Sequence, residues 1–387
     1  MCVISRHTAE AMGDRTPTRS GYFVRVAIIP EASSVLLNVP GDYRLRTTGS
    51  AQVLHEGRGL HSVEVTALPQ GLQVGGLAVP GDGVHVEAEH DGVIAVNGRR
   101  VRGKIEILRL DDARLRVVNR IDLEDYVAAV LVREVPHDWP VEALQAQAIA
   151  SRTYAVYQTA QRAQQDFDLT SDVNSQVYGG RSAERNRTNR AVDMTRGLVL
   201  TYQGQIFPAF FHACCGGRTE SARELWQIDL PPLQGRACPF DFDSPHYAWT
   251  RTIPLSTVEF RLRAAGLTVG TLQRVAGAAW TAGGRLRMVQ LVGTRGSTTL
   301  AAKAFRAALG LDVMKSTFVT LRVHEGQLII QGRGWGHGVG LCQWGARGMA
   351  NAGYSSTEIL QYYYPGARVS GLPPVEPARV AAPAVQP

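Results

Sequence analysis

This 387-residue sequence has no apolar stretch long enough to span a bilayer, and only 19% of its residues are charged. It also lacks a run of five basic residues and any nucleic-acid-binding motif, so the net charge of +7 does not indicate nucleic acid as a partner. The mild positive charge suits an anionic cell wall or membrane surface, or serves solubility alone. With 44% hydrophobic residues, the chain is globular and long enough for two or three domains.

Cysteine is scarce, with five residues and no C-x-x-C pair, which excludes a zinc ribbon. Cys214 and Cys215 are adjacent and cannot normally bridge each other without strain. For Cys215 and Cys238 three interpretations stay open: a disulfide, a metal site that includes His212, or free buried thiols.

Several catalytic signatures are absent. There is no Gly-x-Ser-x-Gly elbow, Walker loop, His-Glu-x-x-His motif or dinucleotide-binding fingerprint. Hydrolysis by a cysteine–histidine pair is conceivable for Cys342 and His337, but no helix N-terminus is expected to activate this thiol. Residues 1–20 hold no apolar signal core, so either the protein stays inside the cell or its export signal lies upstream of this sequence.

The pattern of apolar residues predicts an α+β fold. Short alternating runs separated by Gly-Asp, Asn-Gly and Pro-Gly pairs indicate β-structure up to Val118, and an Ala- and Gln-rich stretch after Pro140 predicts a helix over 141–163. We expect six segments: a disordered lead (1–20), a β-rich N-terminal domain (21–118), a helix-and-strand core (119–250), a smaller α/β insert (251–315), the C-terminal part of the core (316–370) and a disordered tail (371–387).

The most informative segment is 334–344, in which four glycines alternate with two tryptophans, a histidine and a glutamine. Glycine is favoured where the backbone turns sharply or approaches another group closely. Indole faces stack on the apolar faces of sugar rings, whose hydroxyls need amide or imidazole partners. A sugar-binding surface and a glycine-rich bulge with two buried tryptophans are both compatible with this segment.

Three further residues are candidates for chemistry. Glu134 lies between apolar neighbours before a helix, where partial desolvation favours the neutral carboxyl that a general acid needs. The alternative is an exposed glutamate paired with Arg133. His212 ends a strand before a Gly-Gly turn, and Tyr178 precedes another Gly pair, but a core histidine and a buried tyrosine fit these positions too.

Several motifs occur in one order along the chain, at 119–127, 133–136 with Trp139-Pro140, 142–155, 176–180, 211–219 and 334–344. In this order they resemble the SpoIID/LytB family, the bacterial stage II sporulation protein D and its relatives, over about residues 22–370. The resemblance implies a lytic transglycosylase that acts on peptidoglycan outside the cytoplasmic membrane, with no cofactor and with Glu134 as catalytic acid/base. The implied substrate-binding residues are Gln147, Arg152, Tyr154, Tyr178, His212, Gly216, Gly217, Trp335, His337, Gln343 and Trp344.

Two departures limit what the resemblance implies. The family's Ser-Glu-Met-Pro motif reads Arg-Glu-Val-Pro at 133–136, so the glutamate is retained and its neighbours differ. Some zinc-containing members have His and Cys ahead of the Gln-Val-Tyr motif, but the stretch 169–175 has neither, and we expect no metal there. LytB-type relatives are enhancers of a wall amidase, so a non-catalytic, wall-binding role alongside an amidase partner stays open.

Overall fold

The computed structural model describes residues 21–50, 52–89, 92–110, 114–171, 176, 178, 180 and 186–373. The expected disordered lead and most of the expected tail lie outside these ranges. Strands and helices occur in several separate sheets and layers, which confirms the α+β class. None of the helices within the described ranges is long and apolar enough to cross a membrane.

The N-terminal part is one sheet of eleven strands, in the order β11-β1-β10-β9-β6-β2-β3-β4-β5, with β7 and β8 attached beside β2. Alternate side chains such as Val84, Val86, Ile105 and Ile107 are fully buried, as expected from the period of two in a strand. The strands are β1 (Phe23–Ala32), β2 (Ser34–Thr47), β3 (Val53–Leu68), β4 (Gly71–Val74), β5 (Leu77–Pro80), β6 (Gly83–Ala88), β7 (Ile94–Val96), β8 (Arg99–Val101), β9 (Lys104–Arg109), β10 (Leu115–Asp122) and β11 (Leu169–Thr170).

The core begins directly after β10. The Asp122 side chain accepts a hydrogen bond from the Glu124 backbone N–H and so caps helix α1. Helix α2 starts after Pro140, as predicted, and is buried on most sides. The helices are α1 (Leu123–Glu134), α2 (Val141–Gln161), α3 (Asn186–Met194), α4 (Ala222–Trp226), α7 (Gln343–Asn351) and α8 (Ser356–Tyr363), with a 3₁₀ turn, η2, at Pro231–Leu233.

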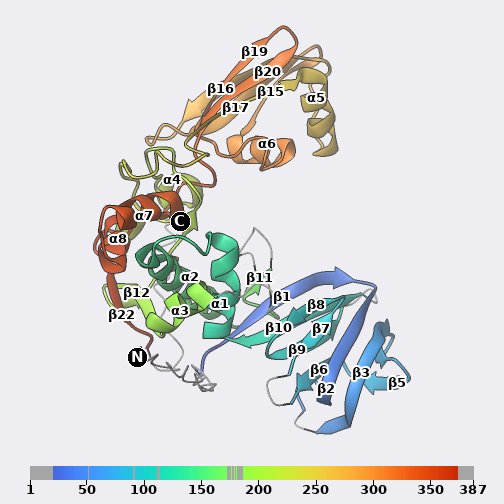
Figure 1. The fold of residues 1–387 in the computed structure, drawn as a ribbon. Helices are drawn as coiled ribbons and strands as arrows, with labels where there is room; N and C mark the ends of the chain where they lie inside the picture. Colours follow the sequence, from blue (N-terminus) through green and yellow to red (C-terminus); the bar gives the residue numbers. More distant parts are fainter. Residues whose placement is uncertain are drawn as a thin grey trace, which may run out of the picture.

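The core is assembled from two distant stretches of chain. Strand β12 (Leu198–Tyr202) pairs with β13 (Gln205–Ile206) and with β22 (Arg368–Gly371), and β14 (Phe211–His212) pairs in parallel with β21 (Leu341–Cys342). These pairings bring the C-terminal helices α7 and α8 against α2. Figure 1 shows these helices between the N-terminal sheet and a second, smaller α/β unit.

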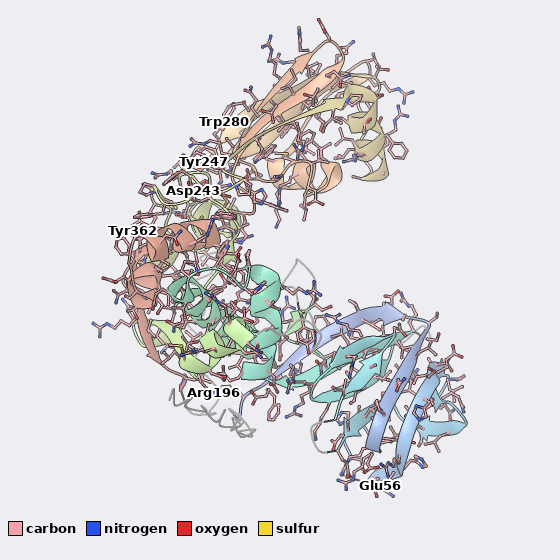
Figure 2. All side chains as sticks on the ribbon, in the orientation of Figure 1. Glu56, Arg196, Asp243, Tyr247, Trp280 and Tyr362 are labelled. Atoms are coloured by element: carbon pink, nitrogen blue, oxygen red, sulfur yellow. The ribbon has the colours of Figure 1, made fainter. Side chains whose placement is uncertain are left out.

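The α/β unit interrupts the core. Its elements are β15 (Ala248–Pro254), α5 (Leu255–Ala264), β16 (Leu272–Trp280), β17 (Leu286–Gly293), β18 (Gly296–Ala301), α6 (Ala302–Leu309), β19 (Val319–His324) and β20 (Gln327–Arg333). The β19–β20 hairpin pairs with β15, and its residues Leu328 and Ile330 share a hydrophobic cluster with Trp249. The unit therefore includes a hairpin that we had expected in the C-terminal part of the core. Figure 2 shows Asp243 and Tyr247 on the stretch that connects core and unit.

Candidate functional site

Glu134 is the last residue of α1, and its side chain is half-buried. Its Oε2 atom accepts a hydrogen bond of 3.2 Å from Nε2 of Gln343, a residue 209 positions further along the chain. Gln343 is itself buried and is the first residue of α7. The start of α7 therefore orients the carboxyl group of Glu134, and these two predicted site residues lie together.

An open groove is lined by residues that follow this pair closely in the chain, Pro136 after Glu134 and Trp344 after Gln343. Its volume is about 440 Å³, and its lining residues are Pro136, Asp138, Trp139, Pro140, Trp344, Arg347 and Asn351. The rings of Trp139 and Trp344 meet edge to face, with centroids 5.3 Å apart. The Arg347 guanidinium lies 4.8 Å from the centre of the Trp344 ring, within the range of a cation–π interaction. The groove thus combines aromatic rings with charged groups, and one of its lining residues, Trp344, directly follows Gln343.

A second cluster, the histidine cluster, consists of Phe210, His212, Trp226 and His337. The His337 ring centroid lies 5.5 Å from that of His212 and 5.1 Å from that of Trp226. Burial lowers the pKa of His337 to about 3 and the pKa of His212 well below its usual range, so both imidazoles are neutral at pH 7.

Hydrogen bonds fix the tautomers of the two histidines. Nδ1 of His212 donates to the backbone carbonyl of Val339, whereas Nδ1 of His337 accepts from the Val339 N–H. Nε2 of His212 is therefore an acceptor, and it has no hydrogen-bond partner among the described residues. Strand pairing sets His212 opposite Cys342, the residue before Gln343, so β14 and β21 connect the histidine cluster to the Glu134 side of the core.

The glycines of 334–344 are required by close approaches. Gly336 has φ of +108°, and a Cβ atom there would lie 2.8 Å from the Cβ of His212. Gly338 has φ of +91°, and a Cβ there would lie 2.4 Å from the guanidinium of the buried Arg285. Any larger residue would displace the histidine cluster or Arg285.

The three aromatic or imidazole side chains of this segment point to different places. Trp344 lines the groove and His337 lies in the histidine cluster. Trp335 instead packs edge-on against His246, with centroids 4.4 Å apart, and the Lys315 ammonium lies 5.1 Å from its ring centre. The segment does not present one continuous aromatic face.

Several predicted substrate-binding residues are engaged inside the core. Arg152 is fully buried and forms a bidentate ion pair with Glu124, at 2.9 and 2.7 Å. The Tyr178 side chain is buried, stacks on Tyr126 and donates its hydroxyl proton to Asn119. Neither side chain reaches a surface that a ligand could contact.

The remaining predicted residues have packing roles. Gln147 is buried and donates to the Ser151 hydroxyl, and Tyr154 packs against Phe210. The backbone N–H groups of Gly216 and Gly217 both point at one carboxylate oxygen of Asp241. These hydrogen bonds hold the Asp241 carboxylate inside the protein.

Sequence reasoning did not select Trp139, Arg347 or Trp226 as site residues. Arg347 lies three positions after Trp344 on α7, a spacing that puts both on one helix face. That signal was readable only once a helix had been predicted at 343–351. Trp226 gives no local signal, because its role depends on a contact across 111 residues.

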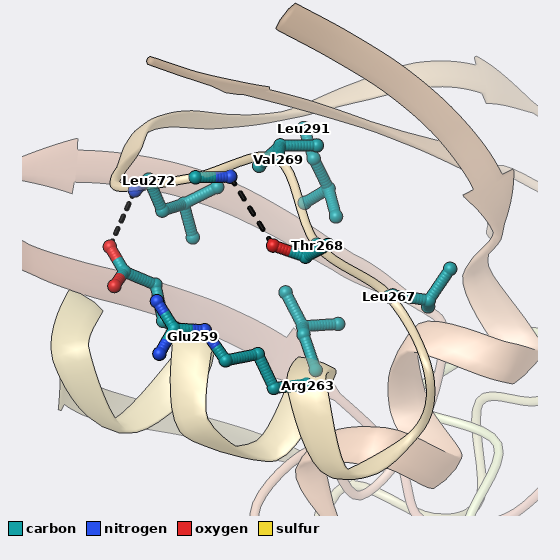
Figure 3. Close-up of a pocket in the computed structure, with 9 residues that line it drawn as sticks. Glu259, Arg263, Leu267, Thr268, Val269, Leu272 and Leu291 are labelled. Carbon is teal, nitrogen blue, oxygen red and sulfur yellow. Dashed lines mark hydrogen bonds between the residues drawn. The ribbon is translucent and has the colours of Figure 1, made fainter. Parts of the chain in front are cut away.

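A separate cavity in the α/β unit is no candidate. Figure 3 shows it between α5 and the loop before β16. Its volume is about 10 Å³, room for about one water molecule. The Glu259 carboxylate that faces it already accepts the Leu272 N–H.

Four buried side chains form a further group, the thiol cluster: Cys215, Cys238, Asp241 and Cys342. Cys342 pairs with His212 of the histidine cluster across β14 and β21. The cysteines at 214, 215, 238 and 342 are all free thiols, so the Cys215–Cys238 disulfide is not formed. His212 is not a member of the cluster. Hydrogen bonds from the thiols of Cys215 and Cys342 lower the pKa of Cys238 to about 3, whereas burial raises the pKa values of those two donors.

Comparison with known proteins identifies the family. The model of the stage II sporulation protein family, SpoIID, matches residues 111–202, which include Glu134. The stage II sporulation protein D of Bacillus amyloliquefaciens is 32% identical over 271 residues, covering 65% of this chain and 75% of the relative. The chain belongs to the SpoIID family.

One further family model and two further relatives also match this chain. A domain of unknown function, DUF8618, matches residues 237–340 and so contains the whole α/β unit. An uncharacterized protein of Brachyspira hyodysenteriae is 30% identical over 344 residues, which are 89% of this chain and 91% of that protein. The amidase enhancer of Bacillus subtilis is 28% identical over 285 residues, and the match covers 61% of this chain and 39% of the enhancer.

Proposed function

We propose that this protein is a peptidoglycan lytic transglycosylase that cleaves glycan strands with Glu134 as its general acid and base. Membership of the SpoIID family supports a role connected with the cell wall. The observation that carries the finer proposal is the Glu134–Gln343 hydrogen bond beside the groove of Trp139 and Trp344. It presents one oriented, half-buried carboxyl next to aromatic faces suited to sugar rings.

One carboxyl is sufficient for this reaction. In its neutral form Glu134 gives its proton to the glycosidic oxygen, and the bond from that oxygen to C1 breaks. The resulting carboxylate takes the proton of the C6 hydroxyl of the same sugar as O6 bonds to C1, which yields a 1,6-anhydro end. No water is consumed, and the carboxyl regains its starting form. A two-carboxylate hydrolase needs a second acidic residue to act as nucleophile or to activate water.

The groove lined by Trp139, Trp344 and Arg347 would bind the glycan strand. An indole face and the Arg347 guanidinium offer stacking and charge to an acidic, acylated sugar, while Asp138 and Asn351 offer polar contacts. We assign substrate contact to Trp344 and Arg347, while Trp139, which is 6% exposed, packs edge to face against the Trp344 ring. Arg152 and Tyr178 are left out of this surface because they are buried and engaged in the core. The proposed substrate places the working protein outside the cytoplasmic membrane.

The test is mass spectrometry of purified glycan strands after incubation with the protein. Products with 1,6-anhydro ends are expected, and Glu134→Gln should slow their release on the order of 10²–10⁴-fold, because the amide cannot transfer the proton. The matched control is Glu325→Gln, at an exposed turn of the α/β unit, which should retain the parent rate. Anhydro products released at the parent rate by Glu134→Gln would contradict the assignment.

The second candidate is a wall-binding enhancer of an N-acetylmuramoyl-L-alanine amidase, favoured by the similarity to an amidase enhancer. In this case the parent protein makes no anhydro ends. Adding it to an amidase raises the release of stem peptides from wall fragments, and Glu134→Gln stimulates as well as the parent does. The two assays together separate the enzyme from the enhancer.

A further inference from the structure

The thiol cluster draws four side chains from three separate segments of the core. Cys215 follows strand β14, Cys238 and Asp241 lie in the loop after the 3₁₀ turn, and Cys342 ends β21. The ligating atoms of the four residues all lie within 4.8 Å of one another, and all four residues are buried.

The donor set has the chemistry of a zinc site. Thiolates favour zinc over magnesium or calcium, and structural zinc takes four ligands in a tetrahedron. Zinc–ligand bonds of the usual lengths put neighbouring ligand atoms roughly 3.5–3.8 Å apart. In the structure, Oδ2 of Asp241 lies 3.0 Å from Sγ of Cys215 and 3.6 Å from Sγ of Cys342. The second of these distances already matches the spacing of zinc ligands, and the first would need to lengthen by about 0.5 Å.

A second observation points to a missing cation. Asp241 is 1% exposed, and its Oδ1 atom has no hydrogen-bond partner among the described residues. A buried carboxylate oxygen without a partner is costly, and a metal ion that the Asp241 carboxylate binds through both of its oxygens removes that cost. Its other oxygen is held by the N–H groups of Gly216 and Gly217, which fixes the carboxylate against the three sulfurs.

The surroundings of the sulfurs are those of metal-bound thiolates. The backbone N–H groups of Cys215 and Gly345 point at Sγ of Cys342, at 3.2 and 3.4 Å. The Tyr363 hydroxyl lies 3.0 Å from Sγ of Cys238. Such outer contacts orient ligands and stabilise their charge. A disulfide, by contrast, would pair only two of the three thiols and leave the third alone with Asp241.

We propose that the thiol cluster binds one structural Zn²⁺ ion through three cysteine sulfurs and the Asp241 carboxylate. The ion fastens the exit of β14 and the Cys238–Asp241 loop to the start of α7. Gln343 follows one of the ligands directly, so the same ion steadies the residue that orients Glu134. The site is set by the protein's own ligands and does not depend on the proposed reaction.

The test measures zinc in the purified full chain by elemental mass spectrometry, after incubation with Zn²⁺ and removal of excess metal. We expect about one zinc per chain in the parent protein, and near-complete loss in Cys238→Ser and in Asp241→Asn. The matched control is Cys214→Ser: Cys214 lies outside the cluster, and a serine hydroxyl can keep the 3.2 Å hydrogen bond that the Cys214 thiol donates to Oδ2 of Asp241. This variant should keep the parent's zinc content.

Cobalt substitution in the parent protein tests the proposal even if the variants fail to fold. Replacement of zinc by Co²⁺ should give an intense sulfur-to-cobalt charge-transfer band and the visible bands of a tetrahedral ion, both abolished by a chelator. A parent that takes up neither metal would overturn the proposal. So would a disulfide within the cluster in the freshly purified protein, or folded Cys238→Ser with the parent's zinc content.

Discussion

The Gln343 amide should control the rate of the proposed reaction by orienting Glu134. Gln343→Leu keeps a side chain of similar size but removes the donor to Oε2 of Glu134. A hydrogen bond to a charged group contributes about 1.5–3 kcal/mol, and each 1.4 kcal/mol is about tenfold in rate. If this contribution is felt fully in the transition state, kcat for anhydro-product release falls about 10- to 150-fold, with a much smaller change in KM.

The matched control is Gln145→Leu. Gln145 is 7% exposed, against 5% for Gln343, and within the described ranges its amide donates to the Met194 sulfur alone, at 3.5 Å. The same substitution there should leave kcat near the parent value. Thermal unfolding of both variants shows whether either change loosens the core. The reasoning is refuted if Gln343→Leu keeps the parent kcat, or if the two variants lose activity equally.

Three other predictions follow from the surroundings of single residues. Trp344→Ala should weaken binding to wall glycan about tenfold, roughly 1.4 kcal/mol by isothermal calorimetry, whereas Trp335→Ala should change it far less, since that ring packs away from the groove. Equal losses would contradict this. Arg152→Met should lower the free energy of unfolding in urea by about 3–5 kcal/mol, because it leaves Glu124 buried without its partner, and adding Glu124→Leu should restore part of the loss. His212 has a lowered pKa, so the unfolded chain takes up its proton first as the pH falls below about 6.5, and stability drops by up to about 1.4 kcal/mol per pH unit. His212→Asn should show a shallower drop between pH 7 and pH 5 in the same titration, and an unchanged slope would refute the assignment.

Local pattern predicted most elements of the fold. The start of α2 after Pro140 and the alternating strands before Val118 depend on neighbours in the sequence, so they were predictable. The end of helix α1 at Glu134 was not predictable in this way, because its last turn is stabilised by packing in the core that the local sequence does not show.

The candidate site is built from contacts between residues far apart in the sequence, so fewer of its features could be predicted. Arg152 looked available for a ligand, but its partner Glu124 comes from another helix, 28 residues away. The directions of Trp335 and Trp344 were not predictable, because positive φ angles at the glycines between them leave this segment without a regular alternation of side chains. Asp241 and Cys342 complete a cluster whose members are up to 127 residues apart.

The pairing of β12 with β22, and of β14 with β21, has a consequence for how the chain folds. During synthesis the N-terminal sheet and the α/β unit hold all their own strands before the last segment appears, so each has the contacts to form early. The core between them does not, because its closing strands and α7 come last. Contacts of such long sequence separation form slowly. Glu134 is synthesised 209 residues before Gln343. The hydrogen bond that orients Glu134 therefore forms only when the last segment completes the core.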